Sequence, residues 1–205
     1  MLESFIYKVN YFLFMVKKKK KEKVEILEEK NIKKIEAFLV RERVYAANKD
    51  EAKSLYDQSR FGEVDRDKVY YSLVEGLYLL EKGRMDVYDG RNKKLKFDEY
   101  VRKARRVEPE FWIRYCVFKD MRNRGYIVKT ALKFGADFRV YDRGVKPGED
   151  HAKWILYPVH EGNVFSWYEF SAKNRVAHST RKNLLIGIVD EENDVTYYNI
   201  AWIRP

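Results

Sequence analysis

The stretch Tyr126–Gly144 (YIVKTALKFGADFRVYDRG) marks the point at which the pattern of the chain changes from helix to strand. Before it, Pro109 stands where proline is tolerated in a first turn, and Gly125 ends a predicted helix at Glu110–Arg124. From Tyr126 onward the pattern predicts strands, with one helix at about Ser166–Lys182 between the third strand and the fourth. The strands are predicted at Tyr126–Thr130, Ala136–Asp142, His151–Val159, Leu184–Val189 and Val195–Ile203.

The sequence before Glu108 is a patchwork of shorter elements. Strands are predicted at Val24–Leu27 and Ala37–Ala46, and helices at Val69–Leu80, which Gly83 stops, and at Phe97–Arg106. Together the elements predict an α+β fold. We expect an N-terminal extension over residues 1–22, a small mixed α/β N-terminal domain over 23–107, and a C-terminal α/β domain with a mixed central sheet over 108–205.

The composition predicts a folded protein with a large aromatic core. Apolar residues make up 45% of the chain and include 16 Tyr, 12 Phe and 4 Trp, which excludes disorder over most of its length. The formal net charge of +10 suits a polyanionic partner. The run Lys17–Lys21 accounts for half of that charge and can exist as a solvated stretch, so charge alone does not decide whether the chain binds nucleic acid.

Two features bear on the compartment. The apolar stretch Phe5–Val16 carries its positive charge after it and is shorter than a membrane span, so we expect neither a signal peptide nor an anchor, but an extension or a start at Met15. The lone Cys116 cannot form an internal disulfide, and within the apolar run Phe111–Phe118 a small buried side chain is the better interpretation than a nucleophile. A reducing cytoplasm fits both features.

The three histidines show no metal-ligand spacing. His151 follows the polar loop Val145–Asp150, His160 ends the same predicted strand, and His178 lies in the last predicted helix. No cysteine pair accompanies them, and neither a phosphate-binding glycine loop nor a nucleophilic-serine elbow is present in the sequence. A metal site is therefore not expected, and for any one histidine taken alone a structural or merely exposed role is favoured over a catalytic one.

Tyr141 ends a predicted strand at the mouth of the loop that leads to His151. Alternation places Phe138 and Val140 on one face of this strand, and Arg139 and Tyr141 on the other. One interpretation is an aromatic residue that packs at a strand end. The other is a phenol held near an imidazole and the basic end of a helix.

Three segments together resemble the tRNA-intron endonucleases of the archaeal type. Tyr126–Gly144 is similar to the family segment that ends in its catalytic tyrosine, and Arg175–Lys182 (RVAHSTRK), followed by Leu184–Asp190 (LLIGIVD), is similar to the segment that carries its catalytic lysine. His151 lies between them at a spacing that fits. The similarity runs from about Ser72 to the C-terminus and is dense from Glu108 onward.

The resemblance implies a transesterification that needs no metal or other cofactor. The ribose 2′-oxygen attacks the adjacent phosphorus and leaves a 2′,3′-cyclic phosphate and a 5′-hydroxyl. From the matching family residues, the resemblance implies that Tyr141 is the base, His151 the acid, and Lys182 the cation that faces the phosphorane. Imidazole suits acid work near neutral pH, whereas a phenol is a poor base unless nearby positive charge, here expected from Lys182 and Arg143, stabilises its anion.

The resemblance also implies an RNA substrate, a precursor tRNA whose helix carries two bulges. Splayed bulge bases and backbone are what a protein can grip on such RNA. Arg175 matches a family arginine that stacks on a bulge base, and Trp202 or Arg204 could supply the second stacking partner. Packing on the last strand is an equal alternative for Trp202.

The chain has a single Tyr/His/Lys set, so the two cuts that the resemblance implies require at least two catalytic chains. The resemblance suggests a homo-oligomer, expected to be a tetramer. The acidic loop Asp190–Asp194 (DEEND) matches a family loop that docks into a basic groove of a neighbouring subunit, although an ordinary hairpin turn would need no partner. The alternatives to an enzyme are a non-catalytic structural subunit of the same complex and a basic RNA-binding module. Structural subunits of the family lack part of the triad, which this chain retains.

Overall fold

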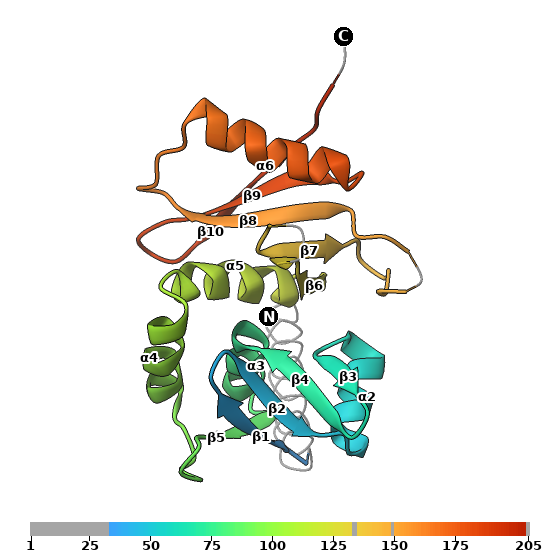
Figure 1. Cartoon of the computed structure of the whole chain (residues 1–205), viewed down its shortest axis with the longest axis vertical. Helices are drawn as coiled ribbons and strands as arrows, with labels where there is room; N and C mark the ends of the chain where they lie inside the picture. Colours follow the sequence, from blue (N-terminus) through green and yellow to red (C-terminus); the bar gives the residue numbers. More distant parts are fainter. Residues whose placement is uncertain (1–32, 133–134, 149, 204–205) are drawn as a thin grey trace, which may run out of the picture. The chain divides into compact units, whose positions relative to one another are not determined.

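Two five-stranded mixed sheets organise the part of the chain that the structure describes (Figure 1). The computed structural model describes residues 33–132, 135–148 and 150–203. Residues 35–205 form one compact unit. Both sheets lie within it, so the expected α+β class is confirmed.

The first sheet has the strand order β3-β4-β2-β1-β5, in which only β1 and β5 run parallel. Its strands are β1 (Ile35–Val40), β2 (Arg43–Ala47), β3 (Glu63–Asp65), β4 (Lys68–Ser72) and β5 (Met85–Tyr88). The helices of this half are α2 (Asp50–Ser59), α3 (Leu73–Glu81) and α4 (Phe97–Val107).

The second sheet has the strand order β10-β9-β8-β7-β6. Its elements are α5 (Phe111–Asn123), β6 (Ile127–Thr130), β7 (Phe138–Tyr141), β8 (Trp154–His160), α6 (Trp167–Ser179), β9 (Asn183–Val189) and β10 (Val195–Ile200). Strands β8 and β9 pair in parallel, because α6 carries the chain back before β9 begins, while the other neighbours are antiparallel. This mixed central sheet is the one expected for the C-terminal half.

Serine caps fix where two of the helices start. Ser72 accepts a hydrogen bond from the Glu75 backbone N–H while the Glu75 carboxylate accepts from the Ser72 N–H, and Ser166 and Glu169 repeat the arrangement at α6. Each pair satisfies two backbone donors that a helix start would otherwise leave open. The cap at Ser166 sets the beginning of the helix that returns the chain to the candidate site.

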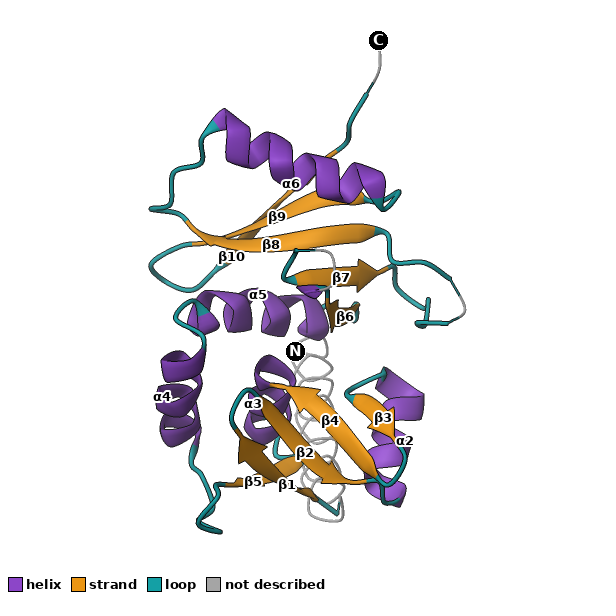
Figure 2. Cartoon of the chain, in the orientation of Figure 1, coloured by secondary structure: helices purple, strands orange, loops and turns teal. Residues whose placement is uncertain are grey.

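The second sheet is covered on both faces (Figure 2). Apolar side chains of its strands pack on one side with those of α5, in a core that includes Phe118, Phe138 and Leu156. On the other side Ile155 and Leu184 form a smaller core with Ala177 of α6. The two faces of β7, β8 and β9 therefore have different neighbours, which decides where each polar side chain of these strands points.

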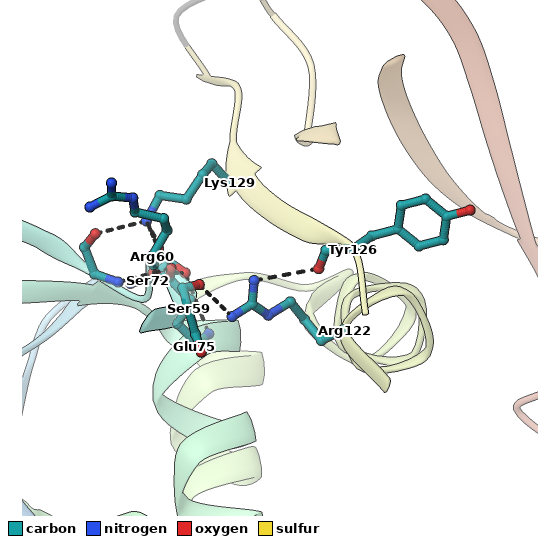
Figure 3. A network of polar contacts seen from close by, with 8 residues as sticks. Ser59, Arg60, Ser72, Glu75, Arg122, Tyr126 and Lys129 are labelled. Carbon is teal, nitrogen blue, oxygen red and sulfur yellow. Dashed lines mark hydrogen bonds and ion pairs between the residues drawn. The ribbon is translucent and has the colours of Figure 1, made fainter. Parts of the chain in front are cut away.

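A buried polar network joins α3 to β6 (Figure 3). Lys129 of β6 donates hydrogen bonds to the Glu75 carboxylate at 3.0 Å and to the carbonyl oxygens of Gly62 and Arg60. Burial would raise the pKa of Glu75, but Lys129 and the hydrogen bonds donated by the Ser72 and Gly62 N–H groups lower it below its usual value. Glu75 is therefore the anion around which the connection between the two halves is built.

Several predicted elements are confirmed within a residue or two, and three predictions are wrong. Helices α4 and α5 and strands β6, β7 and β9 lie where the sequence placed them, and Cys116 is buried, which raises the pKa of its thiol to about 11. Helix α6 and strand β10 are present as predicted, but each ends three residues earlier, at Ser179 and Ile200. The wrong predictions concern Ala37–Ala46, Val69–Leu80 and the start of the strand at His151.

The reasons for the misses are local. Arg41 adopts a left-handed conformation with φ 52°, so Ala37–Ala46 folds back as two strands, β1 and β2, instead of continuing as one. The chain at Val69–Leu80 is extended as far as Ser72, whose capping box starts α3. Strand β8 starts at Trp154, so His151 lies in the loop before it.

None of the helices in the described residues is long and apolar enough to cross a membrane. The predicted extension over residues 1–22 and the predicted strand Val24–Leu27 lie outside the described residues.

Candidate active site

The pairing of β7, β8 and β9 brings Tyr141, Lys153 and Lys182 into one lateral row. Val140 pairs with Trp154, and Trp154 pairs with Asn183. One step beyond these pairs, the Lys153 N–H donates to the Val140 carbonyl at 2.9 Å, and the Lys153 carbonyl accepts from the Asn183 N–H at 3.0 Å. Neighbouring strands lie about 4.8 Å apart, so the backbones of Tyr141 and Lys182 are about 10 Å apart.

By alternation along their strands, the three residues of this row belong to the α6 face of the sheet. Residues two apart on a strand share a face. Lys153 precedes Ile155 by two positions, and Lys182 likewise precedes Leu184, and both apolar residues pack in the core that contains Ala177 of α6. Tyr141 follows Arg139, which pairs with Ile155. The row therefore lies at one end of the strands, on the face of the sheet that α6 covers.

Tyr141 is 5% exposed, and its ring has a recorded contact with a cation that the sequence did not single out. The Arg139 guanidinium lies 6.0 Å from the centre of the Tyr141 ring. Arg143, from which the charge was expected, instead lies 4.9 Å from the centre of the Tyr126 ring. The alternation that placed Arg139 and Tyr141 on one face was the available signal for this neighbour.

His151 is exposed in the loop before β8, two residues ahead of Lys153. Its backbone N–H donates to the Asp150 carboxylate at 2.6 Å. This hydrogen bond holds the backbone of the loop next to Asp150, and the imidazole of His151 stays at the surface. His151 and Lys153 thus both come from the loop that leads into β8.

Lys182 is placed by the end of α6. The Lys182 N–H donates to the Ala177 carbonyl and the Arg181 N–H to the His178 carbonyl, which is the paired hydrogen bonding of a Schellman motif. Its ammonium donates to the Thr180 carbonyl at 2.7 Å. Burial lowers the pKa of Lys182, and the charge of Arg139 lowers it further.

A hollow of about 330 Å³ opens beside Lys182. Its lining comes from the start of β8, the end of α6, the start of β9 and the segment after β10, and consists of Lys153, Asn174, His178, Arg181, Lys182, Asn183 and Trp202. Tyr141 and His151 do not line it. The hollow therefore continues from the row on the side of Lys182.

Of the residues expected to hold RNA, Arg175 and Trp202 are exposed and Arg204 lies outside the described residues. The Trp202 ring lies 4.5 Å, centre to centre, from the ring of His178, which is three positions along α6 from Arg175. Residues three apart on a helix are neighbours on its surface. Trp202 thus lies beyond the last strand, against the α6 surface that carries Arg175.

The acidic loop is a structured turn between β9 and β10. The Asp190 carboxylate accepts hydrogen bonds from the backbone of Glu192 and Asp194, and Asn193 accepts one from the Trp112 indole at 2.6 Å. Glu191 faces His160, with 3.6 Å between the nearest atoms. Glu192 and Asp194 are also exposed, and their carboxylates take part neither in the hydrogen bonds that shape the turn nor in the contact with His160.

Each half of the chain matches a family model built from known proteins. Residues 111–197 match the family model for the tRNA intron endonuclease catalytic C-terminal domain, and residues 35–101 match the model for the tRNA intron endonuclease N-terminal domain. Tyr141, His151 and Lys182 all fall within the first match.

Curated relatives cover most of the chain. A tRNA-splicing endonuclease of Thermococcus onnurineus is 44% identical over 83% of this chain and 97% of its own length. One of Pyrococcus horikoshii is 41% identical over 84% and 98%, and one of Nanoarchaeum equitans is 48% identical over 65% and 88%. The chain therefore belongs to the tRNA intron endonuclease family, with both the N-terminal and the catalytic domain of that family.

Proposed function

We propose that this chain excises introns from precursor tRNA by cutting an RNA helix at two bulges. The observation that carries the proposal is the lateral row, which brings Tyr141 of β7 and Lys182 before β9 to the same edge of one sheet. His151 stands in the loop that enters the strand between them. A phenol, an imidazole and an ammonium at neighbouring strand ends are the groups that a transesterification requires.

In this reaction the 2′-oxygen of the nucleotide at the cut is the nucleophile. Tyr141 takes the 2′ proton, the 2′-oxygen forms a bond to phosphorus, and the bond from phosphorus to the 5′-oxygen breaks. His151 gives a proton to that leaving oxygen. The products are a 2′,3′-cyclic phosphate and a 5′-hydroxyl, and no water or metal ion enters the balance.

Positive charge around the row suits the charge that develops in this step. Lys182 offers an ammonium to the non-bridging oxygens of the phosphorane, where extra negative charge appears. Arg139, whose guanidinium lies 6.0 Å from the centre of the Tyr141 ring, adds a further positive charge beside the row. It occupies the place near Tyr141 that the sequence had suggested for Arg143.

We propose that bulge bases are held on α6 and the segment after β10. Arg175 and Trp202 are exposed, and the indole lies against His178 of the same helix. A guanidinium and an indole can each stack on a base. Arg204 stays a second candidate for the stacking partner.

The proposed assembly is a homotetramer in which the acidic loop docks on a neighbouring subunit. The loop supports this role because Asp190 and Asn193 hold its shape from within, while Glu192 and Asp194 face outward. Because the turn is already formed, the loop would lose little conformational entropy when it docks on a partner.

The decisive experiment incubates the purified chain with an intron-bearing precursor tRNA in the presence of a chelator. The expected result is two cuts and 2′,3′-cyclic phosphate ends, and the same preparation of His151→Ala should cut at least a hundredfold more slowly. Loss of cutting in chelator would contradict the mechanism. Cutting that required a second, different subunit would contradict the homomeric assembly, and binding without cutting in either case would favour the non-catalytic alternative.

A further inference from the structure

The hollow beside Lys182 gathers cations that the proposed reaction does not use. Lys153 and Arg181 line it together with Lys182, and none of the described residues that line it is acidic. The nearby carboxylate with a recorded contact is that of Asp142, which lies 2.7 Å from the Lys153 ammonium. Three cations beside one carboxylate repel one another, and a bound anion relieves that repulsion.

Arg181 occupies a backbone position that an arginine disfavours. It is the residue after the cap of α6, in a left-handed conformation with φ 55°, where glycine is the usual residue of a Schellman motif. Arg181 lines the hollow, so the turn that ends α6 brings a cationic residue there.

Lys153 is the middle residue of the row. Its backbone is bonded to β7 on one side and to β9 on the other, so it lies closer to the backbones of Tyr141 and Lys182 than those two lie to each other. The Lys153 ammonium pairs with Asp142 and lies 4.5 Å from the centre of the Trp154 ring. The ion pair is about half exposed on both sides, and such pairs add little to stability, so an anion in the hollow can compete for this ammonium.

We propose that Lys153 and Arg181 bind the phosphate next to the one that is cut. This inference rests on the proposed function, because the anion is taken to be the backbone of the bulged RNA. Lys182 then serves the reacting phosphate, while Lys153 and Arg181 hold the adjoining nucleotide and fix the register of the RNA chain in the site. Contacts to a phosphate that does not react are made equally before and during the reaction, so they act on binding and not on the chemical step.

The experiment uses the full chain and an RNA helix with two bulges. Binding is measured on RNA with 2′-deoxy nucleotides at the cut sites, and cleavage on the unmodified RNA. Lys153→Met and Arg181→Met should each raise KM about tenfold and leave kcat within about twofold. Each should also reduce the slope of log Kd against log salt by about 0.7–0.9, the contribution of one phosphate contact. Lys153→Arg should restore both values.

The matched control is Lys94→Met. Lys94 forms an ion pair of 2.6 Å with Asp86 in the first half of the chain and is about as exposed as Lys153. It should leave KM and the salt slope unchanged. Asp142→Asn tests whether Lys153 acts only through its ion pair with Asp142. It frees the Lys153 ammonium from that pair, so it should leave KM unchanged or lower it.

Four results would overturn the inference. They are a salt slope unchanged in Lys153→Met, an equal effect in Lys94→Met, a KM raised as much by Asp142→Asn as by Lys153→Met, and a fall in kcat without a change in KM. Thermal unfolding of each variant shows that the fold is retained. A wild-type chain that failed to cut bulged RNA would sink the proposed function itself, whereas normal cutting by both Met variants would sink only this assignment.

Discussion

Lys129 of β6 and Glu75 of α3 form an ion pair of 3.0 Å in which both side chains are less than a tenth exposed. Glu75 also accepts hydrogen bonds from the Gly62 and Ser72 N–H groups, and the cap that starts α3 therefore shares its carboxylate with the contact to β6. Arg122, whose pKa burial lowers to about 10, donates nearby to the Ser59 and Tyr126 carbonyls. The buried Glu75 carboxylate thus pairs with one buried cation, Lys129, and lies near a second, partly buried one, Arg122.

Glu75→Gln should lower the free energy of unfolding by about 3–5 kcal/mol, because it leaves the Lys129 ammonium buried without its counter-ion. Asp86→Asn is the control, since it breaks the exposed pair with Lys94 and should cost less than about 1 kcal/mol. Urea unfolding at neutral pH measures both. Equal losses in the two variants would contradict the role given to Glu75.

The same carboxylate should make stability depend on acidity. The pKa of Glu75 is lowered in the folded chain, so the folded state binds fewer protons than the unfolded state and stability rises with pH. The contribution is complete above the ordinary value of 4.5 and is lost as the pH falls below it. The difference in unfolding free energy between wild type and Glu75→Gln should therefore shrink toward pH 3, and a constant difference would refute this account.

The sequence predicted the second half of the fold better than the first. Helix α5 and strands β6, β9 and β10 could be predicted from the spacing of their apolar residues and from the glycine that follows the helix. In the first half, the turn at Arg41 contains neither glycine nor asparagine, so nothing local interrupted the predicted strand. At Ser72 the capping pattern with Glu75 was present, but the apolar residues before it obscured the change from strand to helix.

The candidate site shows a different limit. Tyr141, His151 and Lys182 were chosen from a resemblance, but neither Lys153 nor Arg139 could be chosen that way. Lys153 joins the row only because β8 pairs antiparallel with β7 and parallel with β9. Strand register is set by long-range pairing, which one sequence does not record.

Tyr141→Phe should slow cleavage at least a hundredfold in a single-turnover assay, since it removes the proposed base and leaves the ring in place. Tyr157→Phe is the matched control. Tyr157 is a buried tyrosine on the same face of the sheet, and its hydroxyl donates to the Gly135 carbonyl. It should change the rate less than threefold. An unchanged rate in Tyr141→Phe would show that the phenol is not the base.

Burial and the charge of Arg139 should together lower the upper pH limit of activity through Lys182. Burial and the Arg139 charge both lower the pKa of Lys182, so the lysine loses its proton at a lower pH than an exposed one would. If its charged form is needed, kcat/KM falls as the pH rises through that pKa. Arg139→Gln removes one cause and should shift this fall to higher pH, while Lys182→Arg should abolish it. A profile unchanged by Arg139→Gln would contradict the coupling.

Neutralising the outward carboxylates of the acidic loop should reduce the mass of the assembly. Glu192→Gln with Asp194→Asn removes two exposed charges and leaves the Asp190 and Asn193 hydrogen bonds that shape the turn, so light scattering should report smaller particles. Asp190 is kept, because its loss would unravel the turn and confuse a structural effect with a lost contact. Glu36→Gln with Asp57→Asn changes the net charge equally at exposed positions and should leave the mass unchanged. If the loop variant and this control had the same mass as wild type, the loop would be an ordinary hairpin turn.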